Sequence, residues 1–289
     1  MIYGRVGFRH IIHHRTSFYI ARGLSILFCN KASPSYVLRI ISLFVLLSHS
    51  KIKTMKCKLF IGAVLSAVLL FHNNGYAQRE TLEGSGNVIT KEIPVKPFDA
   101  LSAGGVFNLV LQQGTTEQVK IEAEDNLQSL FEVSNEGSTL RIKMKKDVNL
   151  KHSKKMNVYV TFKSLKSLNI SSVGNVTAKG VLSFNDLSLE NSSVGNVDLD
   201  LSTQKINVKN SSVGSLKLKG KADNAIIKSN SVGAIDASGF VVQVMDIQND
   251  GVGGAQVNAV KELKVRDSFL GKVKNTGSAP TKKVSKQVI

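Results

Sequence analysis

The second part of this 289-residue chain lacks the side chains on which many enzymes and metal sites depend. Both cysteines, Cys29 and Cys57, precede residue 78, and the chain contains no tryptophan. Residues 78–289 hold a single histidine, His152. These residues can form no disulfide and supply no thiol nucleophile or cysteine metal ligand, so a packed core and backbone pairing must stabilise them. About 210 residues are enough for one domain with a substantial core.

Acidic residues are absent from the first 77 residues, which hold ten of the 38 lysines and arginines. After Met55, two lysines precede an apolar run over 59–71, and Gly75 and Ala77 occupy the −3 and −1 positions of a cleavage site. This layout predicts a signal peptide over 55–77. The apolar run is too short to favour a retained transmembrane helix.

Residues 1–54 then form an upstream extension, which we interpret as wrongly assigned rather than as an unusual leader. Cys57 precedes the apolar run, whereas a lipid-anchored cysteine would follow it. Removing residues 1–77 leaves 28 basic and 21 acidic residues, a net charge of +7 instead of +17. The sequence therefore predicts a periplasmic, cell-surface or secreted protein with no membrane span in the mature chain, and most of the charge that suggested nucleic acid is gone.

A glycine recurs about every 20 residues in the second half of the chain. Aliphatic residues stand six positions before it and, with one alanine, two positions after it, and apolar and polar residues alternate between these columns. A sustained period near 20 predicts a solenoid, and two-residue alternation with β-branched residues predicts strands with one buried face. The spacings are 21, 19, 19, 20 and 18 residues, between Gly174, Gly195, Gly214, Gly233, Gly253 and Gly271.

The predicted fold is all-β: a parallel β-helix of about 20-residue coils with two main sheets. The domain spans 78–277, with longer N-terminal strands over 84–165, repeats over 166–277, and a polar, basic tail at 278–289. In the N-terminal strands we expect hairpin-like turns at Gly114 and Gly137. A second bend in each coil is predicted at a second glycine, present in four coils as Gly180, Gly220, Gly239 and Gly277.

The recurring phrase Ser-Ser-Val-Gly is interpreted as scaffolding. Its glycine is expected to adopt positive φ at a sharp bend, and the preceding valine, or Leu270 in the last coil, to fill the corner of the core. An inward column four positions before the glycine should hydrogen-bond along the axis. The alternative is an exposed serine ladder that binds a ligand. The inward column comprises Ile170, Asn191, Asn210, Ser229, Asn249 and Asp267.

Several segments in order resemble a known family. They are "GSGNV" at 84–88, "FDALSAGGVFNLVLQQG" at 98–114, "VKIEAEDNL" at 119–127, "STLRIKMKK" at 138–146 and "NVYVTFKSLKSLNISSVGNV" at 157–176. Together they are similar to the putative auto-transporter adhesin, head-GIN domain family, found mainly in Bacteroidetes. The resemblance implies a pectin-lyase-like β-helix, an extracytoplasmic location and a role in adhesion, with no catalytic residues to transfer. Family bends usually read Gly-Ser-Gly, whereas most bends here read Ser-Val-Gly and keep the glycine.

Few residues suggest chemistry. His152 lies in a lysine-rich stretch and is expected to be solvated. Asp198 and Asp200 point to one face, which would suit calcium or a polysaccharide lyase. We favour a plainer interpretation, in which Lys217 and Lys219 of the next coil pair with them. No catalytic residue, metal ligand or cofactor is assigned.

A basic segment stands between the N-terminal strands and the repeats. It carries seven basic residues against Asp147 alone: Arg141, Lys143, Lys145, Lys146, Lys151, Lys154 and Lys155. It is either an arm for an anionic ligand such as anionic glycan, lipopolysaccharide or nucleic acid, or a solvated hairpin, which we favour. Aromatic residues for carbohydrate stacking are scarce, and Phe240 and Phe269 lie close to bends where they could close the core.

The sequence thus predicts a non-catalytic binding or adhesion module whose partner is a glycan or an envelope or matrix protein rather than nucleic acid. A homo-oligomer is compatible with it. Two alternatives stay open: a polysaccharide-active β-helix enzyme, and a structural or sensory envelope protein that binds another protein.

Overall fold

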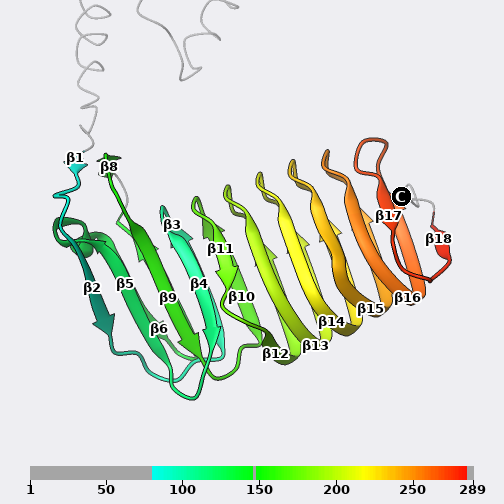
Figure 1. Ribbon diagram of the computed structural model, residues 1–289, viewed down its shortest axis with the longest axis horizontal. Coiled ribbons are helices and arrows are strands. Elements are labelled where there is room, and N and C mark those ends of the chain that lie inside the picture. The colour runs from blue at the N-terminus through cyan, green and yellow to red at the C-terminus, as the bar shows by residue number, and fades with distance from the viewer. Residues whose placement is uncertain (1–79, 146–147, 285–289) are drawn as a thin grey trace, which may run out of the picture. The chain divides into compact units, whose positions relative to one another are not determined.

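The computed structural model describes residues 80–145 and 148–284 (Figure 1). The predicted signal peptide, the upstream extension, Lys146 and the last five residues of the tail lie outside the described residues. Within the described ranges, strands dominate and the helical part is a six-residue 3-10 helix, Asp125–Leu130. This part of the chain contains no helix of the length and hydropathy needed to cross a membrane.

The strands fall into two groups along the chain. The first group comprises β1 (Glu80–Glu83), β2 (Val88–Ile93), β3 (Ala100–Gly105), β4 (Asn108–Gln113), β5 (Gln118–Glu124), β6 (Phe131–Glu136), β7 (Thr139–Met144), β8 (Val148–Lys151) and β9 (Met156–Phe162). The repeats form β10 (Ser167–Ser172), β11 (Val176–Ala178), β12 (Leu182–Asn191), β13 (Val197–Asn210), β14 (Leu216–Ser229), β15 (Ile235–Asn249), β16 (Ala255–Asp267), β17 (Val273–Asn275) and β18 (Thr281–Lys283).

The repeats stack as a parallel β-solenoid, as predicted. Each long strand pairs in parallel with the next coil, so that Val208 of β13 lies opposite Ile227 of β14 and Leu189 of β12. The predicted aliphatic column six positions before the glycine is almost fully buried along its whole length. Stacked coils satisfy one another's backbone groups and form one continuous core.

The long strands pass from one sheet to the other at a corner. In β13, buried and less buried residues alternate regularly as far as Thr203. The next two residues, Gln204 and Lys205, are both exposed, and the alternation resumes at Ile206. Two successive outward residues shift the period-two pattern by one residue, so the same inner side continues around the corner. We call this edge, at Asn185, Gln204, Asp223 and Gln243, the corner edge. The opposite edge, at the six repeat glycines, is the bend edge, and Figure 1 shows its narrow loops along the top.

The second glycine of each coil does not form the corner. Gly220 lies inside β14 with φ +98°, three residues before the corner at Asp223. Gly180 also has positive φ, at +85°, whereas Gly239 has no positive φ and lies within β15. A corner made of two successive outward residues needs no glycine, which explains why Leu201 and Ala259 can replace it.

The repeat glycines lie at the bends, but not because of positive φ. None of the six is among the glycines with positive φ. Instead, a β-carbon on Gly195, Gly214, Gly233 or Gly253 would lie between 2.1 and 2.3 Å from the carbonyl oxygen of the repeat glycine one coil before. Glycine is required here because successive bends stack too closely for any side chain.

Part of the inward polar column, Asn191, Asn210 and Ser229, forms the ladder that the sequence predicts, whereas Asn249 Nδ2 donates to the carbonyl oxygens of Gly253 and Gly271. Asn191 Nδ2 donates to Asn210 Oδ1 at 2.9 Å, and Asn210 Nδ2 lies 3.4 Å from Ser229 Oγ. The second serine of the phrase is buried as well: Ser193 Oγ lies 2.7 Å from Asn191 Oδ1 and 3.1 Å from the Gly195 carbonyl oxygen. These contacts satisfy polar groups inside the bend, which supports the scaffolding interpretation.

The N-terminal strands extend both sheets and cover the first end of the solenoid. β9 pairs in parallel with β4 on one sheet, and β7 pairs in parallel with β3 on the other. The expected hairpin at Gly137 joins β6 and β7. The expected hairpin at Gly114 is wrong: β9 lies between β4 and β5 and pairs with both strands.

The tail begins within the solenoid rather than beyond it. Ala279 is buried, and β18 pairs in parallel with β16, with Thr281 opposite Leu263. A short basic strand therefore continues one sheet past the predicted boundary at residue 277.

Candidate functional site

Two grooves adjoin at the corner edge and share Ser183, Phe184 and Asn185. The first has a volume of about 670 Å³ and is lined by Ser164, Leu165, Lys166, Ser183, Phe184, Asn185, Asp186, Leu187, Ser188, Lys205 and Asn207. The second has a volume of about 880 Å³ and is lined by Val181, Ser183, Phe184, Asn185, Asp200, Leu201, Ser202, Thr203, Gln204, Gly220, Lys221, Ala222, Asp223, Val241 and Gln243. Both volumes lie in the range typical of ligand sites.

A buried aromatic pair holds the segment between the grooves. Phe184 stacks on Phe162 with ring centroids 6.0 Å apart and an interplanar angle of 13°. The side chain of Gln113 donates to the carbonyl oxygen of Ser183 and accepts from its N–H, at 3.1 and 2.8 Å. Thr203 Oγ1 donates to the Asn185 carbonyl oxygen at 3.0 Å. The backbone is thus fixed, while the Asn185 side chain is exposed to both grooves.

Of the 23 residues that line the two grooves, nine carry a hydroxyl or an amide, six are charged (three lysines and three aspartates) and eight are apolar or glycine. Ser183, Asn185, Asn207 and Gln204 can each donate and accept hydrogen bonds. Phe184 is buried and offers no exposed ring for stacking. Because the lysines and aspartates are equal in number, such grooves are suited to an extended polar ligand that carries hydroxyl groups and little net charge.

An ion pair stands at the rim of the first groove. Lys166 Nζ lies 2.8 Å from Asp99 Oδ2. This contact, with a smaller contribution from Ser138, lowers the pKa of Asp99, and the same carboxylate raises the pKa of Lys166. The lysine charge at this rim is therefore largely compensated.

Asp198 contacts a lysine of the next coil, as the plainer interpretation predicts, whereas Lys217 Nζ lies 3.8 Å from Asp236 Oδ2. Asp198 and Asp200 lie opposite Lys217 and Lys219, and Lys219 Nζ is 3.0 Å from Asp198 Oδ1. The pKa of nearby Asp236 is lowered mainly by hydrogen bonds from Ser238. Among the described residues, no group of three or more acidic, histidine or cysteine side chains could hold a metal ion.

His152 lies at the surface of the first section. Its side chain is 80% exposed, and its Nδ1 lies 3.3 Å from Glu83 Oε1. Its backbone has φ +52°, a left-handed conformation uncommon for residues other than glycine.

The basic segment is divided between two sheets. Arg141 and Lys143 belong to β7, which pairs with β3, whereas Lys155 precedes β9, which pairs with β4. Arg141 lies 2.9 Å from Glu136 Oε2. The remaining described residues of the segment, Lys145, Lys151 and Lys154, lie around β8, and Lys154 donates its backbone N–H to Glu124.

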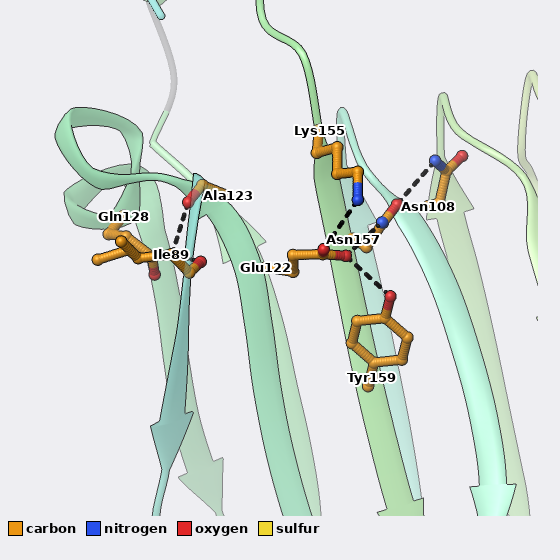
Figure 2. Close-up of polar contacts among 8 residues, drawn as sticks. All are labelled: Ile89, Asn108, Glu122, Ala123, Gln128, Lys155, Asn157 and Tyr159. Atoms are coloured by element: carbon orange, nitrogen blue, oxygen red, sulfur yellow. Dashed lines mark hydrogen bonds and ion pairs between the residues drawn. The ribbon is translucent and has the colours of Figure 1, made fainter. Parts of the chain in front are cut away.

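Lys155 takes part in a polar cluster on the outer face of the first section (Figure 2). Glu122 accepts hydrogen bonds from Lys155 Nζ at 3.1 Å, Asn157 Nδ2 at 2.8 Å and Tyr159 Oη at 2.9 Å. These three donors, Asn157 first, lower the pKa of Glu122, and the carboxylate raises the pKa of Tyr159. Asn157 Oδ1 also accepts from Asn108 Nδ2, which links the cluster to β4.

The valines of the repeated phrase point outward, contrary to prediction. They align at the bend edge as one row, which we call the valine ridge, and each member is between 49% and 61% exposed. The side chains alternate through the bend, so that the buried serine two positions before the glycine leaves the next residue outside. The ridge comprises Val106, Val173, Val194, Val213, Val232, Val252 and Leu270.

The two phenylalanines near bends differ from each other. Phe240 is fully buried and closes the core, whereas Phe269 is 88% exposed beside the end of the ridge, with Lys272 Nζ 5.9 Å from its ring centroid. The grooves could not be predicted from a sequence motif, because their residues come from separate coils and are brought together only at the corner edge. The outward valines could have been found by continuing the period-two pattern past Asn191 and Ser193.

Comparison with known proteins gives a family and a fold. The family model described as "Putative auto-transporter adhesin, head GIN domain" matches residues 97–279. A crystal structure of a putative adhesin from Bacteroides fragilis is similar, with 28% identity and a TM-score of 0.61, over 70% of this chain and 100% of that chain. No curated protein matches the chain significantly.

Two further structures share the fold at lower identity. A putative adhesin from Parabacteroides distasonis has 21% identity and a TM-score of 0.52, over 71% of this chain and 96% of that chain. A putative lipid binding protein from the same species has 18% identity and a TM-score of 0.51, over 71% of this chain and 100% of that chain.

Proposed function

We propose, since this chain belongs to the putative auto-transporter adhesin, head GIN domain family, that it is an extracytoplasmic, non-catalytic binding module that acts in adhesion. The similarity to a putative adhesin along the whole length of that structure supports this role. The signal peptide that the sequence predicts at 55–77 supports export to the periplasm, the cell surface or the medium.

The proposed ligand is a glycan, bound along the corner edge. The observation that carries this proposal is the pair of adjoining grooves around Asn185. Their hydroxyl and amide side chains match the alternating donors and acceptors of sugar hydroxyls. The fixed backbone at Ser183 and Asn185 reduces the entropy that the protein loses on binding.

A binding role is favoured over catalysis by two ion pairs at or beside the grooves. Asp198 is paired with Lys219, and Asp99 with Lys166. The buried polar groups of the repeats bond to one another within the bends. A polysaccharide lyase would instead need an acidic cluster for calcium beside a free base.

The experiment is a glycan and matrix-protein array probed with the purified protein at low and high salt. We expect saturable binding to a defined uncharged glycan that survives high salt and is lost in Asn185→Arg, which places a long charged side chain between the grooves. Analysis of the bound glycan should find it uncleaved. Binding that high salt abolishes would assign recognition to the basic segment 141–155 instead. Binding to proteins alone would contradict a glycan ligand.

A further inference from the structure

The valine ridge is an exposed apolar row with a fixed repeat. One branched aliphatic side chain projects from each bend. Each ridge valine from Val173 to Val252 donates its N–H to the coil before, as from Val213 N–H to the Ser193 carbonyl oxygen at 3.0 Å. The last bend is built differently, because Lys272 N–H donates to the Leu270 carbonyl oxygen at 2.9 Å. Neighbouring strands lie about 4.8 Å apart, so the seven members span roughly 29 Å. Figure 1 shows the bends in line along one edge.

The flanks of the ridge carry no charge over four successive coils. The columns on either side are exposed and consist of small or amide residues: Ser171, Ser192, Ser211 and Asn230 on one side, and Asn175, Asn196, Ser215 and Ala234 on the other. The amides are held in register, since Asn175 Oδ1 accepts from Asn196 N–H and Asn196 Oδ1 accepts from Ser215 N–H. In a chain with excess positive charge, this edge is one at which two copies can meet without like-charge repulsion.

We propose that the valine ridge is a homotypic contact, in which the bend edges of two copies of this chain pack together in antiparallel orientation. A second copy is the partner whose apolar side chains have the same spacing of about 4.8 Å, so the two rows can interdigitate along their whole length, as in a steric zipper. An isologous contact of this kind has two-fold symmetry and closes on itself.

The charged residues that flank the ridge lie near its C-terminal end, which favours one orientation. Lys272 flanks the ridge beside Leu270, at its C-terminal end, whereas Gly104 and Asn108 flank Val106 at its other end. Asp250 flanks Val252 on the other side of the ridge. A parallel contact would gather the charges of both copies at one end, whereas an antiparallel contact places each Lys272 and each Asp250 at opposite ends of the contact. Val213 is the fourth of the seven ridge residues, so it lies next to Val213 of the second copy.

The contact is weak in dilute solution. A row one residue wide buries much less than the roughly 800 Å² per partner of a typical stable interface. It gains strength when many copies are held on one surface, because the second contact then forms at a high effective concentration. This inference rests on the bend edge alone and does not depend on glycan binding at the corner edge.

The test is covalent trapping of single-cysteine variants in a background with Cys29→Ser and Cys57→Ser. A short bismaleimide avoids the strict geometry of a disulfide. Val213→Cys should yield covalent dimer, whereas the matched control Gln204→Cys, on the corner edge of the same coil, should stay monomeric. A mixture of differently tagged Val106→Cys and Leu270→Cys should cross-link between the two variants, and neither should cross-link with itself.

Two results would overturn the proposal. One is a monomeric Val213→Cys, or equal dimer yields for it and Gln204→Cys, which would leave the ridge to a different partner. The other is self-cross-linking of Val106→Cys, which would exclude the antiparallel orientation. Adding Val194→Lys to Val213→Cys should abolish the dimer, because the lysine would have to be desolvated, and the melting temperature should stay unchanged. Persistence of the dimer in this variant would also contradict a contact through the ridge.

Discussion

Gly195 lies directly against the carbonyl oxygen of Gly174 in the preceding coil: a β-carbon on Gly195 would stand 2.2 Å from that oxygen. The same relationship links Gly214 to Gly195 and Gly233 to Gly214. Each bend therefore fixes the spacing of the next, and the repeated phrase is a device for stacking coils.

Gly195→Ala should destabilise the fold by about 1–3 kcal/mol, because the bend must shift to admit a methyl group. The matched control is Gly239→Ala, where the nearest atom to a new β-carbon is Lys219 Cγ at 3.6 Å. Urea unfolding of both variants measures the difference. Equal stabilities would show that the bends do not stack as closely as described.

Asn210→Ala should cost about 1–3 kcal/mol, since it removes the acceptor of Asn191 Nδ2 and of Ser212 Oγ inside the core. Asn207→Ala lies on the same strand with its side chain outside and should change stability little. Thermal or urea denaturation compares the two variants. A neutral Asn210→Ala would mean that the amide ladder contributes nothing to stability.

The direction of the valine side chains can be tested with a nearly isosteric change. Val208→Thr places a hydroxyl in the core, where the side chain is 1% exposed, and should cost about 1–3 kcal/mol. Val213→Thr, at 56% exposure, should change the free energy of unfolding by about 0.5 kcal/mol or less. A large loss of stability in Val213→Thr would show that the valines of the ridge are buried in the core.

Glu122 should make stability depend on pH. Its pKa is lowered in the folded protein from an ordinary value of 4.5 by Asn157, Tyr159 and Lys155. Its ionised form therefore stabilises the fold above that value, and the contribution is lost as the pH falls through the lower folded-state pKa. Tyr159→Phe should reduce the free energy of unfolding by about 1 kcal/mol near pH 7, and the difference should shrink towards about pH 2. A difference that does not change with pH would exclude the ionised carboxylate as its cause.

The solenoid could be predicted from the sequence because its signals repeat. The aliphatic columns and the period near 20 require no knowledge of distant contacts. The inward direction of Asn191 and Asn210 could also be predicted, because each lies two positions after a buried aliphatic residue, Leu189 or Val208. The reason for the glycines could not be read in the same way. A positive φ and a close approach both select glycine, and distinguishing them requires the position of the preceding coil.

The outward valines were misread because an apolar residue was assumed to be buried. Apolar atoms make up more than half of a typical protein surface, so Val194 alone gives no direction. The insertion of β9 between β4 and β5 depends on a long-range pairing, which no local turn signal at Gly114 reveals. The grooves were missed because Asn185, Gln204 and Asp223 meet only through stacking.

The most direct test of the proposed function compares glycan binding by the unmodified protein with binding by one variant at each edge. The glycan is the one selected on the array, and calorimetry measures its affinity at high salt. Asn185→Arg, at the corner edge, should abolish binding, whereas Val213→Thr, at the bend edge, should bind as the unmodified protein does. Undiminished binding by Asn185→Arg, with its melting temperature unchanged, would contradict a glycan site in the corner-edge grooves.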